Sequence, residues 1–225
     1  RHRDTTQGRH MRTEDRDRLW GLVHAERAAL ADDLAGLEPE QWHHRTLCGR
    51  WDVEDVVAHL VAAALTGRGR WIRSIVGARF RTDVHNQRRL EEHKGRDPEE
   101  TFARFRAAVD STIAPTGHTA AYLGEVLVHA QDIRQPLGLP KRPSVEALTP
   151  VADSFAKQYF AVSSRKVAAG LELVASDGPF RAGAGPRVEG STLALVMSMA
   201  GRDAYLDELE GPGLEELRAR ASAGR

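Results

Sequence analysis

Apolar residues at helical spacing are the feature that most limits the fold of this chain. In segment 13–37, leucine and valine recur at intervals that match the helical repeat, which places their side chains on one face of an α-helix. Gly36 and Pro39 mark the end of that helix. The sequence therefore opens with a long amphipathic helix suited to a helical bundle. Its apolar face consists of Leu19, Leu22, Val23, Leu30, Leu34 and Leu37.

Local signals predict three more long helices. Asp52 is a typical N-cap residue, and Asp55 follows in the first turn, where negative charge suits the helix dipole. Pro98 occupies a favoured first position of another helix, Pro115 ends it, and Pro136 ends the last one. The predicted bundle helices span residues 13–37, 53–66, 98–113 and 119–135, and shorter helical segments are expected at 71–80 and 83–93.

The pattern changes after residue 140. Segment 139–144 contains two prolines and is typical of a linker. A mostly helical stretch follows at 145–162, with Pro150 as an expected restart point. Short strands are predicted at 171–175 and 187–189, separated by turn residues, as a hairpin or meander. The expected organisation is a disordered leader at 1–12, a helical bundle at 13–140 and a small α+β domain at 141–225, in which Ser191 caps a helix to Ala200 and a last helix spans 213–220.

Composition limits the partners and the compartment. The 225 residues contain 32 Lys plus Arg and 32 Asp plus Glu, so no basic footprint for nucleic acid or an anionic membrane is present. Apolar segment 56–65 is much shorter than the roughly 20 residues of a membrane span. Cys48 is the only cysteine, which excludes an intrachain disulfide and favours a reducing compartment. We expect a cytoplasmic protein without a signal peptide, either a monomer or a homodimer.

Three residues have the chemistry of a metal site. Glu125 and His129 are four positions apart on a predicted helix, so their side chains share one face. His59 lies in the apolar helix 53–66, where a neutral imidazole is costly unless its nitrogens are bound. Together they would form a three-ligand centre with an open position, as in catalytic zinc sites. A hydrogen-bonded core histidine and a solvated Glu–His pair remain the alternative from spacing alone. Zn²⁺ suits the ligand set, which does not exclude Ni²⁺ or Mn²⁺.

Two sequence blocks resemble a known family. Segment 48–60, CGRWDVEDVVAHL, is similar to the signature of the mycothiol-dependent maleylpyruvate isomerase family, and segment 125–138, EVLVHAQDIRQPLG, is similar to its second block. This family belongs to the DinB-like metal-binding bundles. The resemblance implies a mostly α fold, a DinB-like four-helix bundle followed by a small α+β C-terminal domain, with His59, Glu125 and His129 as ligands. Weaker similarities include Asp83, Asn86, 185–190 and 200–202.

The resemblance also implies a chemistry. Mycothiol, a low-molecular-weight thiol, would bind at the open position of the metal and act on a small electrophilic substrate, by isomerisation or by S-transfer. Arg202 is the candidate to bind a carboxylate of substrate or thiol, because a guanidinium matches a carboxylate bidentately. Asp132 and Arg134 are expected to form a structural ion pair or to support the site. Two alternatives stay open: a metal-assisted hydrolase that needs no thiol, and a non-enzymatic metal- or ligand-binding protein.

Overall fold

The structure is a computed structural model that describes residues 3–67, 82–114, 117–157 and 169–223, with the backbone alone at 3–12, 82–86 and 222–223. The predicted helix at 71–80 lies outside the described residues. The chain divides into two compact units, Arg1–His129 and Ala130–Arg225, which are described one at a time. The division falls within a helix and not at a linker, so the domain ranges 13–140 and 141–225 stay predictions.

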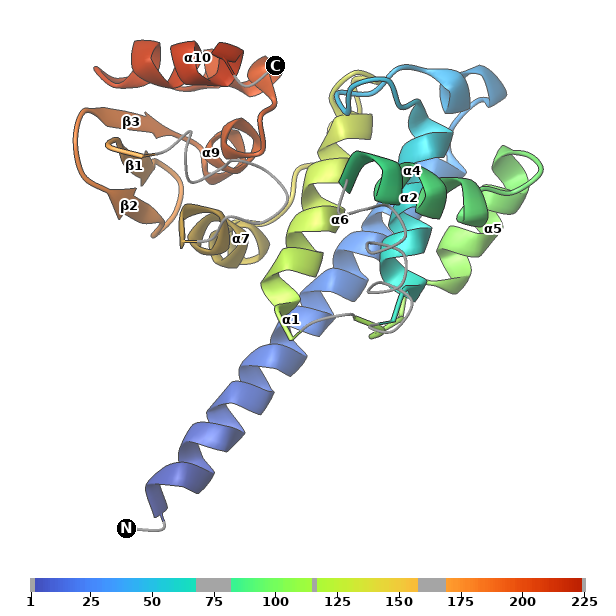
Figure 1. Cartoon of the computed structure of the whole chain (residues 1–225), viewed down its shortest axis with the longest axis horizontal. Helices are drawn as coiled ribbons and strands as arrows, with labels where there is room; N and C mark the ends of the chain where they lie inside the picture. The colour runs from blue at the N-terminus through green and yellow to red at the C-terminus, as the bar shows by residue number, and fades with distance from the viewer. Residues whose placement is uncertain (1–2, 68–81, 115–116, 158–168, 224–225) are drawn as a thin grey trace. The chain divides into compact units, whose positions relative to one another are not determined.

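The first unit contains the predicted helical bundle (Figure 1). Helix α2 packs against α4 and α5, and α1 packs against α5. Trp20 of α1 stacks on Tyr122 of α6, with ring centroids 6.0 Å apart. The elements are α1 (Arg3–Ala35), η1 (Pro39–His43), α2 (Val53–Leu65), α4 (Thr82–His93), α5 (Pro98–Ala107) and α6 (Thr119–Arg134), the last of which continues into the second unit.

Helix α2 is the centre of this unit. Asp52 and Asp55 form the predicted N-terminal cap: the Asp52 side chain accepts a hydrogen bond from the Asp55 backbone N–H at 2.8 Å, and Asp55 accepts one from the Asp52 N–H at 3.4 Å. Such reciprocal bonds satisfy N–H groups that a helix start leaves unpaired. Val53, Val57 and Val61 are fully buried. Neighbouring elements thus cover α2 on several sides, which makes it a rigid support for a side chain such as His59.

Helix α5 ends at Ala107, six residues before the predicted end at Ile113. The reason is a side chain from another helix. Buried Arg27 of α1 donates hydrogen bonds to the backbone carbonyls of Ala108, Val109 and Ser111 at 3.4, 3.4 and 2.8 Å. Burial lowers the pKa of Arg27 to about 10, so it stays a cation at neutral pH. A cation at these carbonyls complements the negative end of the α5 dipole.

Helix α1 includes residues for which the sequence predicts a disordered leader. It begins at Arg3, and its side chains from Thr13 to Arg18 are exposed. A helix without a packed face gains little from tertiary contacts. The disorder of residues 1–12 therefore stays a prediction. None of the helices in the described part of the chain is long and apolar enough to cross a membrane.

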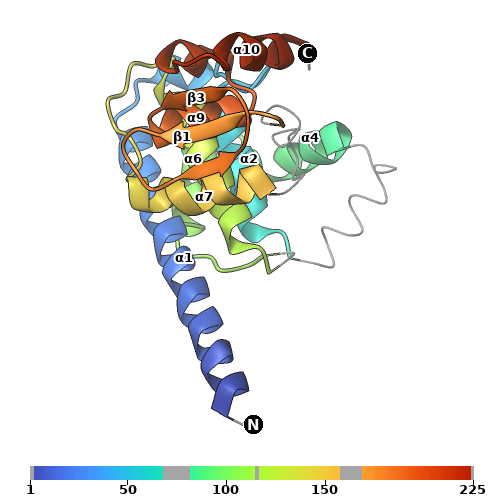
Figure 2. The same ribbon diagram turned by 90° about the vertical axis from the view of Figure 1, so that its left-hand side faces the viewer.

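The second unit is a small α+β domain (Figure 2). Strand β1 lies in the centre of a sheet with the order β2-β1-β3. Strand β2 is not predicted from the sequence and pairs antiparallel with β1, whereas the two predicted strands, β1 and β3, are parallel, so the expected hairpin or meander of these two strands is wrong. Helices α7 and α9 pack together, and α9 also contacts β1 and β3. The elements are α7 (Val145–Lys157), β1 (Glu172–Ala175), β2 (Arg181–Gly183), β3 (Arg187–Gly190), α9 (Thr192–Met199), η2 (Asp203–Glu208) and α10 (Leu214–Ala223).

Two local features of this unit differ from the sequence expectation. Pro150 lies inside α7, which continues through it without a restart. The turn from β2 to β3 passes close to the backbone at the start of β1. A Cβ atom on Gly183 would lie 2.1 Å from the Leu171 carbonyl oxygen, and a Cβ atom on Gly185 would lie 2.0 Å from the Gly170 carbonyl oxygen. These glycines have φ angles of 78° and 134°. Only glycine allows both the backbone angle and the approach.

Candidate metal centre

Helices α2 and α6 bring the three predicted site residues together. One ligand atom from each of His59, Glu125 and His129 lies within 4.8 Å of the others. A single carboxylate oxygen of Glu125, Oε2, is 3.2 Å from Nε2 of His59 and 3.4 Å from Nε2 of His129. The two imidazole rings meet edge to face, with centroids 4.8 Å apart and planes at 75°. Both histidines therefore point the same ring nitrogen at one oxygen.

This donor set fits a tetrahedral zinc ion. Zinc binds imidazole nitrogen and carboxylate oxygen at about 2.0–2.2 Å, which separates neighbouring donors by about 3.3–3.5 Å in a tetrahedron. The two Glu–His distances, 3.2 and 3.4 Å, are close to that separation. The same distances are those of hydrogen bonds without an ion. The residues therefore fit a divalent cation and also satisfy one another.

The electrostatics of the cluster favour an ionised carboxylate. His59 and His129 are 8% and 9% exposed, whereas the Glu125 side chain is 35% exposed. Burial alone would raise the pKa of Glu125, but hydrogen bonds from His129 and His59 outweigh it and hold that pKa below its usual range. Glu125 is therefore an anionic donor at neutral pH and also the solvent-facing side of the cluster.

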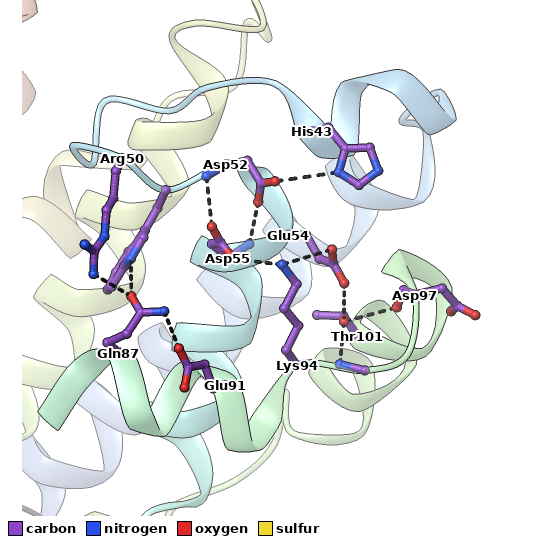
Figure 3. Close-up of polar contacts among 12 residues, drawn as sticks. His43, Arg50, Asp52, Glu54, Asp55, Gln87, Glu91, Lys94, Asp97 and Thr101 are labelled. Atoms are coloured by element: carbon purple, nitrogen blue, oxygen red, sulfur yellow. Dashed lines mark hydrogen bonds and ion pairs between the residues drawn. The ribbon is translucent and has the colours of Figure 1, made fainter. Parts of the chain in front are cut away.

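An aromatic side chain packs beside the two histidines. The ring centroid of Trp51 is 5.0 Å from that of His59 and 6.3 Å from that of His129. Its indole N–H donates to Oε1 of Gln87, on α4, at 3.4 Å. Arg50 Nη2 donates to the same oxygen at 3.0 Å (Figure 3). Sequence reasoning missed Trp51 and Gln87 as site residues, although Trp51 directly precedes the cap of the helix that carries His59.

Asp55 is close to His59 in sequence but faces a different group. Its carboxylate is 2.8 Å from Nζ of Lys94, which is also 3.3 Å from buried Glu54 (Figure 3). Thr101 donates to the other oxygen of Glu54 at 2.9 Å. Burial would lower the pKa of Lys94, but the carboxylates of Asp55 and Glu54 outweigh it and raise that pKa. This cluster thus neutralises a buried glutamate and ties α2 to α4 and α5.

Arg202 is engaged within the second unit. Its Nε and Nη2 donate to the two oxygens of Asp132 at 2.9 and 2.6 Å, and Nη1 donates to the Ala200 carbonyl at 2.6 Å. The Asp132 side chain is 0% exposed and that of Arg202 is 14% exposed. The bidentate edge that could bind a ligand carboxylate is therefore occupied by Asp132. The side chains of Asp83 and Asn86 lie outside the described residues.

Comparison with known proteins identifies the bundle. Residues 23–119 match the model of the mycothiol maleylpyruvate isomerase N-terminal domain. This part of the chain is thus similar to the N-terminal domain of the mycothiol maleylpyruvate isomerases. The match covers most of the bundle and includes His59, whereas Glu125 and His129 follow its last residue. No protein of curated function matches the chain by sequence.

Two solved structures share the fold over most of the chain. They are crystal structures of the mycothiol-dependent maleylpyruvate isomerase and of a histidine-to-alanine mutant of it. Each gives a TM-score of 0.62 at 14% sequence identity and covers 88% of this chain and 92% of the other. The fold is thus a DinB-like four-helix bundle followed by a small α+β domain, as the family resemblance predicts.

Proposed function

We propose that this protein is a metal-dependent enzyme of the mycothiol-dependent maleylpyruvate isomerase family that uses mycothiol to act on a small electrophilic substrate. The observation that carries the proposal is the convergence of both histidine Nε2 atoms on one oxygen of Glu125, at 3.2 and 3.4 Å. The family resemblance supports a thiol as the co-substrate and isomerisation as the reaction. S-transfer follows from the same chemistry and is the second outcome that an assay must separate.

Zinc is the proposed ion, because two imidazoles and one carboxylate are ligands it commonly takes in catalytic sites. A divalent cation there would stabilise a thiolate, which is the nucleophile needed for addition to an activated double bond, in isomerisation or in S-transfer. His59, Glu125 and His129 are the residues that would hold it. Three protein ligands leave room for the thiol.

The proposed metal centre is shielded from solvent on one side and exposed to solvent on the other. Trp51 places an aromatic ring against His59 and within 6.3 Å of His129, which keeps water from that side of the imidazoles. Glu125 is the most exposed of the three proposed ligands. We infer that thiol and substrate approach from the side of Glu125, because this side of the cluster is the one open to solvent.

Arg202 remains the proposed binding group for a carboxylate of the substrate or the thiol. Asp132 already occupies its bidentate edge. A ligand carboxylate must therefore use other N–H groups of the guanidinium or compete with Asp132. The role is separable from metal binding, because an arginine is not a zinc ligand.

Cobalt substitution joined to thiol titration tests this function. With Co²⁺ in place of the native ion, we expect added thiol to produce a thiolate-to-metal charge-transfer band and a saturable rise in turnover. The His59→Ala variant should lose both, while the control His44→Ala, which changes an exposed histidine, should keep both. Full turnover in thiol-free buffer would indicate a metal-assisted hydrolase. A spectral response without turnover on any electrophile would indicate a binding protein.

A further inference from the structure

The His59 ring lacks the hydrogen bond that usually orients a metal-binding histidine. Its Nε2 faces Glu125, but its Nδ1 is buried and has no hydrogen-bond partner among the described residues. Histidines that bind metals almost always donate the second ring N–H to a carboxylate, a carbonyl or water, which fixes the ring plane. Some other contact must therefore hold the His59 ring in the orientation that points Nε2 at Glu125.

Trp51 makes that contact, and its backbone is fixed. The rings of Trp51 and His59 lie 5.0 Å apart at 40°, within the range of attractive aromatic pairs. The Trp51 backbone N–H donates to the Cys48 carbonyl at 3.1 Å, and its carbonyl accepts from the N–H and the hydroxyl of Thr46 at 3.2 and 2.8 Å. Gly49, with φ at 59°, allows this tight turn. These hydrogen bonds of the loop thus fix the position of the Trp51 backbone that carries the indole.

Gln87 fixes the far end of the indole. Its Oε1 accepts from Trp51 Nε1 at 3.4 Å and from Arg50 Nη2 at 3.0 Å, and its Nε2 donates to Glu91 at 2.9 Å (Figure 3). With both ends of the amide bonded, the oxygen cannot turn away from the indole without losing bonds. Gln87 belongs to α4, which packs against α2. The position of the indole is therefore fixed by its own loop and by Gln87 of α4.

We propose that Trp51 and Gln87 are positioning residues of the metal centre. Gln87 holds the indole N–H, and the indole ring holds the His59 imidazole with Nε2 facing Glu125 and His129. Ring packing thus replaces the missing hydrogen bond at Nδ1. This inference rests on the proposed metal site and adds that α4 influences metal binding although it supplies none of the three ligands.

A double-mutant cycle on metal affinity tests whether Gln87 acts through Trp51. By chelator competition with Zn²⁺, Trp51→Ala should weaken binding by about 10–100-fold, the usual effect of losing a group that orients a ligand. Trp51→Phe keeps a ring but loses the N–H, so it should cost less. Gln87→Leu should weaken binding several-fold in the wild-type background and have no effect in the Trp51→Phe background, because Gln87 acts through the indole N–H.

Three comparisons make the cycle specific. Trp42→Phe changes another tryptophan of the same unit and should leave affinity unchanged. The exchange Gln87→Glu with Glu91→Gln keeps the acceptor for Trp51, the net charge and a hydrogen bond between positions 87 and 91 with its direction reversed, so it should keep wild-type affinity. Additive effects of Gln87→Leu and Trp51→Phe, or wild-type affinity in Trp51→Ala, would overturn the proposal.

A readout on the metal-free protein separates this inference from the proposed function. The indole ring current should shift the His59 ring protons in NMR spectra of the apoprotein, and Gln87→Leu should change that shift while the apoprotein melting temperature stays within a few degrees. Unchanged His59 resonances in Gln87→Leu would contradict the positioning role. A wild-type protein that binds no metal would instead contradict the proposed function, and the NMR result would still decide whether Gln87 orients the ring.

Discussion

Glu125 is the residue that connects the two histidines, because one of its oxygens faces both imidazoles. Without an ion, this oxygen accepts two hydrogen bonds. With an ion bound, the carboxylate and the two imidazoles would all coordinate that ion. In the proposed site, the same three side chains would change from a hydrogen-bonded cluster to a set of metal ligands with little movement, and the carboxylate would keep hydrogen-bond partners in the apoprotein.

We predict that His59→Ala and His129→Ala each reduce bound metal to less than about a tenth of an equivalent while the bundle stays folded, because two protein ligands hold zinc far more weakly than three. Elemental analysis gives the metal content, and far-UV circular dichroism gives the fold. Normal metal content in either variant would remove that residue from the ligand set. An unfolded variant would show that the histidine is needed for the core.

Arg202 supports a prediction on stability as well as on ligand use. The Asp132 carboxylate is fully buried against it, so Arg202→Met should lower the free energy of unfolding by about 3–5 kcal/mol, the usual cost of removing one partner of a buried ion pair. Arg142→Met removes an exposed pair with Glu208 and should cost less than about 1 kcal/mol. Urea unfolding measures both.

The ligand role of Arg202 has its own signature. If it also binds a substrate or thiol carboxylate, KM should rise in Arg202→Met while metal content stays at one equivalent. An unchanged KM would assign Arg202 to the Asp132 pair alone. Unfolding free energies equal to wild type would contradict the buried pair itself.

Among the elements, the starts of α2, α5 and α9 could be predicted from the sequence, whereas the end of α5 could not. Asp52, Pro98 and Ser191 act within one turn of their own helix, so the sequence shows their effect directly. The end of α5 depends on Arg27, which is about 80 residues away in the chain and reaches it only after α1 has packed. The parallel β1–β3 pairing and the Gln87–Trp51 contact likewise depend on tertiary packing, which no local pattern encodes.

The proximity of the three proposed ligands could be predicted in part for a related reason. Glu125 and His129 share a helix, so their spacing fixes their common face. His59 was conspicuous because it interrupts an apolar helix. Spacing alone did not decide between a metal site and a core histidine, and the family resemblance was needed to join the two helices.

The α5 terminus gives a prediction at this scale. Arg27→Met keeps most of the aliphatic packing but removes the hydrogen bonds that a cation donates to three backbone carbonyls, so it should cost about 1–3 kcal/mol of unfolding free energy. Hydrogen exchange should show faster opening at the end of α5 than in wild type. Arg142→Met is again the matched surface control. Wild-type stability in Arg27→Met would mean that the contact contributes nothing measurable.

For the whole molecule, metal binding should stabilise the folded state. An ion that binds only the folded chain adds about 2.7 kcal/mol when its free concentration is about a hundred times Kd, and each kcal/mol raises Tm by about 2–4 °C for a chain of this size. We therefore predict that Zn²⁺ raises Tm by about 5–10 °C and that a chelator reverses the shift. Differential scanning calorimetry measures it, and His59→Ala should show no shift.

The central claim is that His59, Glu125 and His129 hold one divalent metal ion. Elemental analysis of protein purified without a metal-affinity tag, joined to native mass spectrometry, tests it most directly. We expect about one equivalent of a divalent ion, most simply zinc, in wild type after reconstitution. Less than about a tenth of an equivalent after reconstitution with zinc or nickel would contradict it, because the same donor set should hold either ion.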